Sequence, residues 1–343
     1  MLKNKSHGFI KLAPYVKFKI DDNHILQIGS GTLHFSVTKL IQKFLQTAKY
    51  LKEGIIRSEF DAILNTESIE LRELMHEFIQ QKAFFLNHDY DKHARYSRHC
   101  LYFNLVHPDA DPLVIQEKIK QSKVVILGCG GIGNLMSTQL AAAGVGNITL
   151  VDDDIIEESN LTRQIIFNES DIGKKKVDVL EKKLMALNAK INIRKHATKI
   201  NSTSDLAAFE QNDLIVVSAD KPANIILMVN EYSKTSGVAF INVGYIQDIG
   251  VYGPLVTSGK SDTFSQGLKK YVHQKNAHVY SDEIQHLNKD LQAPSFGPLN
   301  MLVTGFAASE ILKYLGGIQA FNSLHHRIGI YPEQLMFEKQ LFE

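Results

Sequence analysis

A glycine-rich turn between an apolar run and an amphipathic stretch constrains this chain more than any other feature of its sequence. Residues 123–127 read Lys-Val-Val-Ile-Leu, which is typical of a parallel strand buried on both faces. Gly-Cys-Gly-Gly-Ile-Gly follows at 128–133. Apolar residues then recur at helical spacing as far as Ala143, and Gly144 is a suitable C-terminal cap. Strand, glycine turn and helix in this order predict an α/β domain whose first turn can bind a phosphate.

Three later apolar runs indicate further strands of the same sheet. They cover residues 148–151, 214–217 and 239–243, and helical segments separate them at 175–188 and 223–233. Strands that alternate with helices form parallel sheets with helices on both faces. We therefore predict an α/β fold, a Rossmann-like, mostly parallel sheet within a domain of residues 89–343.

Residues 1–88 differ in pattern and indicate a separate small module. Apolar and polar residues alternate at 15–20, and a second run at 25–28 predicts the other half of an antiparallel hairpin. Helical spacing follows from Val37 to Leu45 and again from Ile69 to Ile79. A hairpin with short helices is typical of a winged-helix-like (α+β) module, a type commonly used for binding. We expect residues 87–111 to connect it to the larger domain.

Composition narrows the class of protein. The 343 residues include 38 Lys+Arg and 37 Asp+Glu, and this balance argues against a basic field for nucleic acid or a membrane surface. We find no secretion signal and no apolar run of the ~18 residues that a membrane span needs. The two cysteines, Cys100 and Cys129, cannot build a disulfide framework. We expect a cytoplasmic protein with neither nucleic acid nor membrane as a partner.

An acidic residue at a suitable distance from the glycine turn indicates a nucleotide. Asp152 follows the second strand, 19 residues after Gly133, where its carboxylate can accept hydrogen bonds from ribose hydroxyls. The glycines allow backbone amides at the helix start to face an anionic phosphate. These features by themselves fit a nicotinamide dinucleotide, so an oxidoreductase is the first hypothesis to consider.

The residues that follow favour a triphosphate instead. Asn160, Arg163 and Gln164 come within a dozen residues of the acidic strand end, and Lys176 opens the next helical segment. Arg and Lys can stabilise the charge on a transferring phosphorus and a departing pyrophosphate, whereas a nicotinamide cofactor has no need for them. Asp220 ends the Ser-Ala-Asp segment, where it could hold the Mg²⁺ that accompanies ATP.

These motifs, in this order, resemble the adenylating superfamily that includes ThiF, MoeB, HesA and the ubiquitin-activating enzymes. The resemblance covers about residues 94–331 and rests on Gly-Cys-Gly-Gly-Ile-Gly, the stretch 150–164, Lys176 and Ser-Ala-Asp. Arg-Tyr-Ser-Arg at 95–98 resembles the family's RYxRQ segment, with His99 in place of the usual Gln. Segments 242–255 and 294–298 are similar to the branch that modifies ribosomally made peptides, as in microcin C and pantocin A biosynthesis, where an N-terminal module captures the precursor peptide.

The resemblance implies a role for each matched residue. Asp152 would bind the ribose of ATP, and Gly131 would lie beneath the phosphates. The other residues implied in ATP binding are Gly128, Gly130, Gly133, Asp154, Asn160 and Gln164. The resemblance implies catalytic roles at the triphosphate for Arg163 and Lys176. It implies that Asp220 binds the Mg²⁺. It also implies a homodimer in which Arg98 acts in the ATP site of the partner subunit.

The resemblance implies an enzyme that uses ATP and Mg²⁺ to adenylate a carboxylate of a ribosomal precursor peptide. In a pantocin A-type enzyme, glutamate side chains are activated and lose water. In a microcin C-type enzyme, the peptide's C-terminal residue is activated and a phosphorus–nitrogen bond forms. We favour the first, with the second as an alternative. Adenylation of a sulfur-carrier protein, as by ThiF or MoeB, and a non-catalytic peptide-binding role are further alternatives.

Two departures from the family bear on this choice. Many relatives bind zinc through two CxxC pairs, and this chain has neither, so we expect no zinc site and interpret His273, His278 and His286 as surface residues. Neither cysteine lies where a thioester relay would be expected. The missing zinc cysteines are the reason for favouring the pantocin A-type reaction. We expect the polar segment 257–293 to cover the bound peptide.

Overall fold

A computed structural model describes residues 8–30, 33–81, 84–86, 91–257 and 294–341. The chain divides into two compact units, Met1–Gln116 and Glu117–Glu343. The boundary between residues 88 and 89 stays a prediction. Across the described ranges, every helix is too short or too polar to cross a lipid bilayer.

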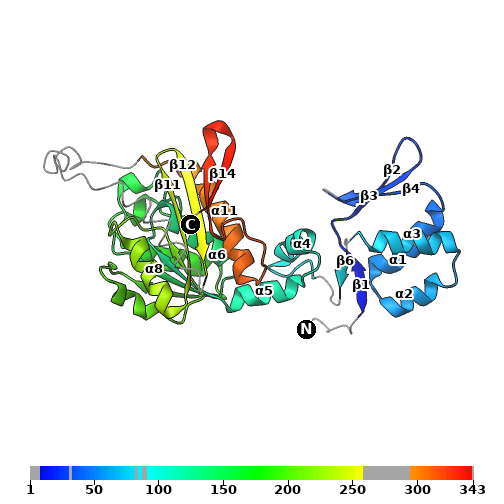
Figure 1. Ribbon diagram of the computed structural model, residues 1–343, viewed down its shortest axis with the longest axis horizontal. Coiled ribbons are helices and arrows are strands. Elements are labelled where there is room, and N and C mark those ends of the chain that lie inside the picture. Colours follow the sequence, from blue (N-terminus) through cyan, green and yellow to red (C-terminus); the bar gives the residue numbers. More distant parts are fainter. Residues whose placement is uncertain (1–7, 31–32, 82–83, 87–90, 258–293, 342–343) are drawn as a thin grey trace. The chain divides into compact units, whose positions relative to one another are not determined.

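The first unit combines two small antiparallel sheets with helices (Figure 1). One sheet has the order β5-β1-β6 and the other β2-β3-β4. The elements are β1 (Phe9–Leu12), β2 (Lys17–Ile20), β3 (Leu26–Ser30), β4 (Leu33–Val37), α1 (Ile41–Glu53), β5 (Ile55–Ile56), α2 (Arg57–Leu64), α3 (Ile69–Ile79), β6 (Phe84–Leu86) and α4 (Ser97–Val106). The pairing of β2 with β3 confirms the predicted hairpin, and α3 confirms the second helical stretch. Phe44 and Phe78, both fully buried, pack edge to face at the centre of its core.

The start of the first helix in this unit was predicted wrongly. The first helical stretch begins at Ile41 and not at Val37, because Val37 ends β4, where it pairs with Leu26. Leu40, between the strand and the helix, has a left-handed backbone (φ 57°), which ends one regular element before the next begins. Part of the expected connector at 87–111 is regular as well, since α4 occupies Ser97–Val106.

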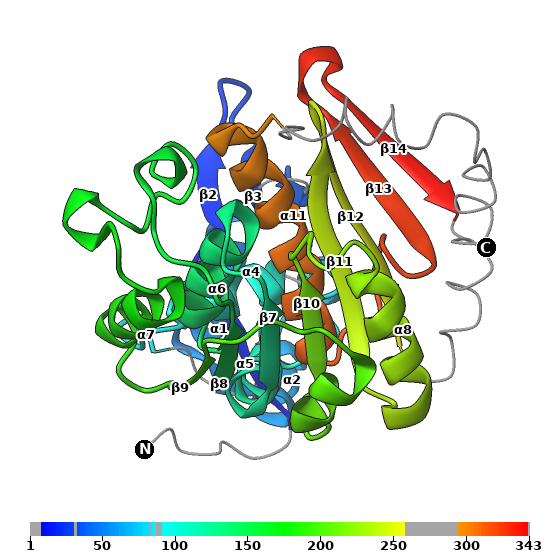
Figure 2. The same cartoon turned by 90° about the vertical axis from the view of Figure 1, so that its left-hand side faces the viewer.

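The second unit is built on an eight-stranded sheet with the order β14-β13-β12-β11-β10-β7-β8-β9, seen face-on in Figure 2. Its strands are β7 (Lys123–Leu127), β8 (Asn147–Val151), β9 (Asn192–His196), β10 (Leu214–Val217), β11 (Ala239–Ile246), β12 (Ile249–Val256), β13 (His326–Tyr331) and β14 (Met336–Leu341). The five strands from β11 to β9 run parallel. β12, β13 and β14 continue the sheet antiparallel. The mostly parallel sheet is therefore confirmed, and β9 and β12 to β14 are strands that the sequence analysis did not predict.

Helices cover both faces of this sheet. They are α5 (Pro112–Gln121), which straddles the boundary of the two units, α6 (Gly131–Ala143), α7 (Lys176–Leu187), α8 (Ile225–Ser236) and α11 (Gly297–Leu315). Figure 1 shows α8 on one side of the sheet and α6 with α11 on the other. α8 packs on the alternate side chains of β7 and β10, including Val125 and Ile215, as the strand repeat of two requires. Gly144 ends α6 in a left-handed conformation (φ 88°), which confirms the predicted cap.

Close backbone contact at the glycine turn fixes where α6 begins. Gly128 has φ +90°, a conformation that disfavours any side chain. A Cβ atom on Gly133 would overlap the carbonyl oxygen of Gly128. Gly130 is different, because a Cβ atom there would have no neighbour within 4 Å and its backbone is extended (φ −71°). Gly128 and Gly133 are therefore required by the backbone of the turn, whereas Gly130 leaves open space beside it.

This difference predicts opposite outcomes for two equally small substitutions. Gly133→Ala forces two backbone segments apart and should lower the free energy of unfolding by at least about 2 kcal/mol. Gly130→Ala meets no atom and should change it by less than about 1 kcal/mol. Urea denaturation of the two variants beside the parent protein measures both values. Equal stability of the two variants would contradict the packing described here.

Candidate active site

The carboxyl ends of β7, β8 and β10 meet at one edge of the sheet, and the predicted site residues follow them. The chain runs from β7 to β8 on one side and returns to β10 on the other side of β7, so this edge is a topological switch point. Ligands of open α/β sheets bind at such points.

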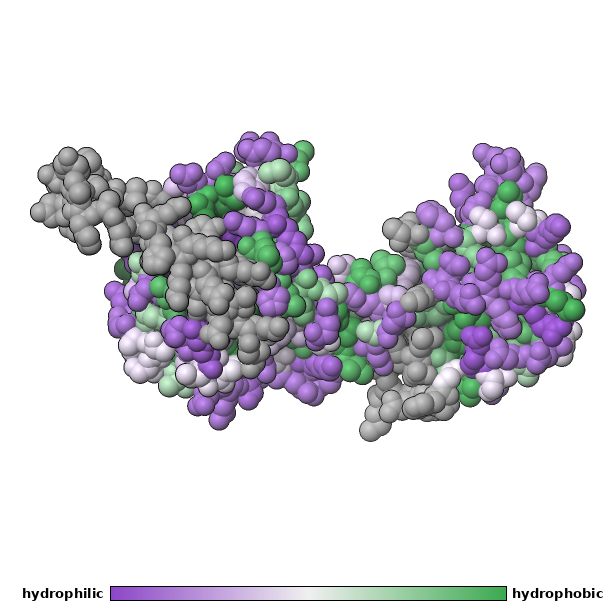
Figure 3. All heavy atoms as spheres, in the orientation of Figure 1, coloured by the Kyte–Doolittle hydropathy of each residue, from purple (hydrophilic) through white to green (hydrophobic). Residues whose placement is uncertain are grey.

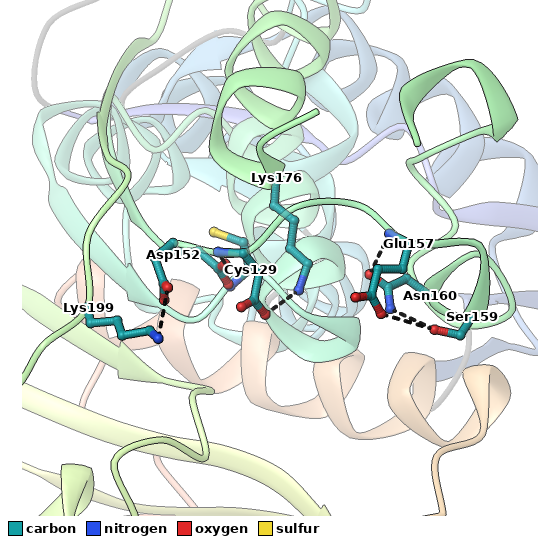
Figure 4. A network of polar contacts seen from close by, with 9 residues as sticks. Cys129, Asp152, Glu157, Ser159, Asn160, Lys176 and Lys199 are labelled. Carbon is teal, nitrogen blue, oxygen red and sulfur yellow. Dashed lines mark hydrogen bonds and ion pairs between the residues drawn. The ribbon is translucent and has the colours of Figure 1, made fainter. Parts of the chain in front are cut away.

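The glycine turn and Asp152 form the centre of this edge (Figure 4). Asp152 Oδ2 accepts a hydrogen bond of 2.6 Å from the backbone N–H of Cys129, and Oδ1 accepts one of 2.8 Å from Asp154. Burial raises the pKa of Asp152, against the opposing effect of the nearby Lys176. A raised pKa means that the ionised carboxylate lowers the stability of the fold at neutral pH. Buried carboxylates with a perturbed pKa, such as Asp152, are common at functional sites.

Lys176 lies beside this carboxylate and is held by its neighbour Asp154. Lys176 begins α7, and its side chain is only 6% exposed, whereas that of Asp154 is 63% exposed. The Lys176 Nζ and Asp154 Oδ2 atoms are 2.8 Å apart. The ammonium has three donors, so two remain for a ligand. Asp153 pairs with Lys199, with Oδ2 and Nζ 3.3 Å apart.

The loop after β8 brings Asn160, Arg163 and Gln164 together. Its 3₁₀ helix, η1 (Glu158–Asn160), is closed by a capping box in which Asn160 Oδ1 accepts from the N–H of Glu157. The carbonyl of Asn160 accepts from the N–H groups of Arg163 and Gln164. Arg163 lies against the glycine turn, since its Cγ would be 3.4 Å from a Cβ atom on Gly131. Gln164 is 2% exposed, and its Oε1 has no hydrogen-bond partner among the described residues.

Asn300 is a residue of this site that the sequence analysis missed. It lies in the first turn of α11, fully buried, and its Nδ2 fills the space that a side chain on Gly131 would occupy. Its Oδ1 has no partner in the described part of the chain. Gly297, at the start of the same helix, lies against the carbonyl of Thr162. The segment 294–298 was singled out as a motif, and its position before a helix was the available signal.

Asp220 and Arg98 are two further residues with predicted roles, Asp220 in the second unit and Arg98 in the first. Asp220 lies at the same edge as the glycine turn, because its neighbour Ala219 packs on Gly128, and its side chain is exposed. Arg98 is exposed on α4 in the first unit. The roles of these two residues stay predictions.

Both cysteines, Cys100 and Cys129, are buried. Burial raises the pKa of the Cys129 thiol, and the Asp152 carboxylate adds to the effect, so Cys129 is a poor nucleophile. Within residues 8–257 and 294–341, as far as they are described, no three His, Cys, Asp or Glu side chains gather in a way that could hold a metal ion. The expected position of the zinc cysteines, His273, His278, His286 and the segment expected to cover the peptide lie outside the described residues.

Three observations show that this edge fits a nucleoside triphosphate. The N-terminus of α6 has no side-chain cap, so its first amides are available to an anion. The space above Gly130 is open. Arg163, which packs on Gly131, and Lys176, which lies near Asp152, provide positive charge. Asp220 is a suitable Mg²⁺ ligand, because Mg²⁺ in such sites binds one or two carboxylates together with the phosphates.

Known proteins are similar to this chain, some in part of the sequence and others over nearly the whole fold. A probable adenylyltransferase/sulfurtransferase, MoeZ of Mycobacterium tuberculosis, is 36% identical over 148 residues, which are 43% of this chain and 36% of MoeZ. The chain thus covers about a third of the length of MoeZ and of a probable molybdopterin-synthase adenylyltransferase of Porphyra purpurea. The crystal structure of E. coli MccB with ATP is 31% identical, covers 97% of both chains and has a TM-score of 0.81.

A second similar structure and a family model also match this chain. The structure of PaaA has a TM-score of 0.70 at 19% identity over 96% of this chain and 99% of its own, so it shows the fold alone. The ThiF family model matches residues 96–338, the span that carries the glycine turn, Asp152, Arg163, Lys176 and Asp220. The chain belongs to the ThiF family.

Proposed function

We propose that this protein uses ATP to adenylate a carboxylate of a ribosomally made precursor peptide. The observation that carries the proposal is the likeness to MccB over 97% of both chains, because it includes the N-terminal unit as well as the nucleotide edge. MccB has been crystallised with ATP and, as the microcin C7 biosynthetic enzyme, with N-formylated MccA. The MoeZ match covers only 43% of the chain, which makes adenylation of a sulfur-carrier protein the weaker hypothesis.

The reaction needs positioning and charge stabilisation more than a protein nucleophile. A peptide carboxylate is already ionised at pH 7, and it attacks the α-phosphorus while the bond to pyrophosphate breaks. The amides at the start of α6 and the side chains of Arg163 and Lys176 hold the phosphates and balance their negative charge. Asp152 accepts hydrogen bonds from the ribose. Mg²⁺, held by Asp220, would neutralise charge on the leaving pyrophosphate.

Two reactions after activation remain to be distinguished. The missing zinc cysteines favoured glutamate activation and loss of water, as in pantocin A biosynthesis. The likeness to MccB, which is 31% identical over 97% of both chains and is named as the microcin C7 biosynthetic enzyme, favours the alternative, activation of the C-terminal residue with formation of a phosphorus–nitrogen bond. We propose the microcin C-type reaction as the first to test and keep the dehydrative one as the second.

We also propose a homodimer in which Arg98 of one subunit completes the ATP site of the other. Arg98 is exposed on α4, as a residue that contacts a partner must be. An arginine supplied in trans can stabilise the charge that develops during phosphoryl transfer.

The substrate and reaction can be read from the mass of the product. The protein is incubated with ATP, Mg²⁺ and synthetic peptides encoded by short open reading frames beside its gene. An added nucleotide mass supports the microcin C-type reaction, and loss of water supports the dehydrative one. Pyrophosphate release that requires a carrier protein ending in Gly-Gly, and occurs with no peptide, would overturn the proposal.

Removing the charged side chains of the site should stop turnover without weakening peptide binding. Arg163→Ala should lower the rate of pyrophosphate release about 100- to 1,000-fold, since it removes a group that stabilises the reaction's charge. Asp220→Ala should do the same through loss of the Mg²⁺ ligand. Peptide affinity, measured by fluorescence anisotropy, should stay within about twofold of the parent value. Lys199→Ala, which removes an exposed partner of Asp153, is the matched control and should remain active.

Filling the open space of the glycine turn should weaken ATP binding selectively. A methyl group on residue 130 meets no protein atom, so Gly130→Ala keeps its fold but occupies space that the phosphates need. ATP affinity, measured by calorimetry, should fall at least about tenfold, equivalent to 1.4 kcal/mol. The urea unfolding midpoint of the same variant, which should stay close to that of the parent protein, serves as its control. Parent-like ATP affinity would show that the phosphates bind elsewhere.

A further inference from the structure

The two cations of the nucleotide edge, Arg163 and Lys176, lie on different parts of the excursion that the chain makes between β8 and α7. Backbone pairs close this excursion near its end. The N–H of Gly173 donates to the carbonyl oxygen of Ile156, and the N–H of Lys176 donates to that of Asp154. These pairs hold Lys176 directly. Arg163 comes ten residues before Gly173 and takes no part in them, so its position depends on other contacts.

Lys183 provides one such contact from α7. Its Nζ atom donates to the carbonyl oxygen of Ile166, the last residue of the Arg163 loop, by which we mean residues 157–166. Lys176 and Lys183 are seven residues apart, which is about two turns of α-helix, so both side chains leave the same side of α7. One helix therefore carries Lys176 at its start and, about 10.5 Å further along its axis, the side chain that holds the end of the Arg163 loop.

A buried carboxylate keeps Lys183 in this position. Asp171 Oδ2 lies 2.6 Å from Lys183 Nζ, and the side chain of Asp171 is only 9% exposed. The same oxygen accepts from the N–H of Asn168, which closes the 3₁₀ helix η2 (Glu169–Asp171). Burial by itself raises the pKa of Asp171, but the hydrogen bonds from Lys183 and Asn168 outweigh it and hold the pKa below its ordinary value. The carboxylate is therefore ionised at neutral pH and attracts the ammonium.

Stability alone is a weak reason for this ion pair. Charged side chains normally lie at the surface, and on the face shown in Figure 3 hydrophilic residues cover much of each unit. A carboxylate that is taken out of water costs free energy, and its pairing with a cation offsets this cost with little net gain. The Asp171–Lys183 pair instead gives the Arg163 loop a fixed position, because it orients the ammonium that binds Ile166.

We propose that Lys183 is a positioning residue of the nucleotide site, which fixes Arg163 relative to Lys176. The inference rests on the proposed function, which places both cations at the triphosphate, and adds the contact that sets their spacing. Lys183 acts through Arg163 and needs no contact with ATP. In a reaction that depends on placing charges, a displacement of about 1 Å can lower the rate about 100-fold.

Removing the ammonium of Lys183 should slow turnover without weakening peptide binding. Lys183→Met keeps a side chain of similar length and should lower kcat for pyrophosphate release about 10- to 100-fold, with the KM for peptide within about twofold of the parent value. Lys183→Arg, whose guanidinium can donate to both Ile166 and Asp171, should keep kcat within about threefold. A Lys183→Met enzyme as fast as the parent would overturn the proposal.

Lys195→Met is the matched control for these variants. Lys195 lies on β9 and pairs with Asp178 of the same helix α7, with Nζ and Oδ1 2.9 Å apart. The variant therefore also removes an ion pair of α7, but one that does not include the Arg163 loop. Its kcat should equal that of the parent protein. A loss of kcat as large as that of Lys183→Met would overturn the proposal, because any weakening of α7 would then have the same effect.

A double variant separates the position of the loop from the stability of the fold. Lys183→Met leaves the charge of Asp171 without its nearest cation, which destabilises the fold. Adding Asp171→Asn removes that charge, and the asparagine can still accept from the N–H of Asn168. The urea unfolding midpoint of the double variant should lie close to that of the parent, while kcat stays reduced because the contact with Ile166 is still missing. Parent-like kcat of the double variant would overturn the proposal.

A double-mutant cycle identifies the residue through which Lys183 acts. In the Arg163→Ala background no guanidinium remains to be positioned, so Lys183→Met should change the rate of pyrophosphate release by less than about twofold. A purely structural role predicts the same loss in both backgrounds. Equal losses of rate with Arg163 present and absent would overturn the proposal.

The same cycle can be measured on the binding of the ATP analogue AMPCPP, which needs no peptide. By calorimetry, Lys183→Met should weaken AMPCPP binding about tenfold in the parent protein and less than about twofold in the Arg163→Ala background. Equal affinities of the parent and Lys183→Met would overturn the proposal, as would equal losses in both backgrounds. If the parent protein releases no pyrophosphate with any peptide, the proposed function fails, whereas the AMPCPP affinities still judge the role of Lys183.

Discussion

The close approach of Gly133 to the carbonyl oxygen of Gly128 is the contact on which the nucleotide edge depends. With no side chain at 133, helix α6 can start directly above the end of β7. The amides of its first turn then point toward the carboxyl edge of the sheet, and Cys129 can donate its N–H to Asp152 on the neighbouring strand. Each later feature of the site is placed relative to this turn: the Arg163 loop packs on Gly131, and Asn300 of α11 fills the space beside it.

The parallel part of the sheet could be predicted from the sequence because its strands are continuous apolar runs. Residues 124–127 and 214–217 are buried on both faces, and such runs leave few alternatives. The start of the first long helix could not be predicted in the same way. Val37 fits a helical repeat and a strand repeat equally well over so short a window, and the left-handed backbone of Leu40 decides between them.

The residues of the site also differ in whether the sequence alone could predict them. Glycines, Asp152, Arg163 and Lys176 follow strands at recognisable distances, so their order in the sequence already indicates a shared edge. The position of Asn300 depends on the packing of α11 against α6, more than 150 residues earlier in the chain, and no local pattern reports such a contact. The pairing of Lys176 with Asp154 is equally a matter of three dimensions, since it joins the start of a helix to a strand end 22 residues away.

That ion pair has a consequence for how the site exchanges ligands. A buried ammonium without a partner would be strongly unfavourable, so Asp154 serves as a resident anion whenever phosphate is absent. Its side chain is mostly exposed and can turn into water at little cost when a stronger anion arrives. The same carboxylate can pair with Lys176 again as pyrophosphate leaves. We therefore expect Asp154 to compete with an incoming phosphate for Lys176 and to favour the release of the outgoing pyrophosphate.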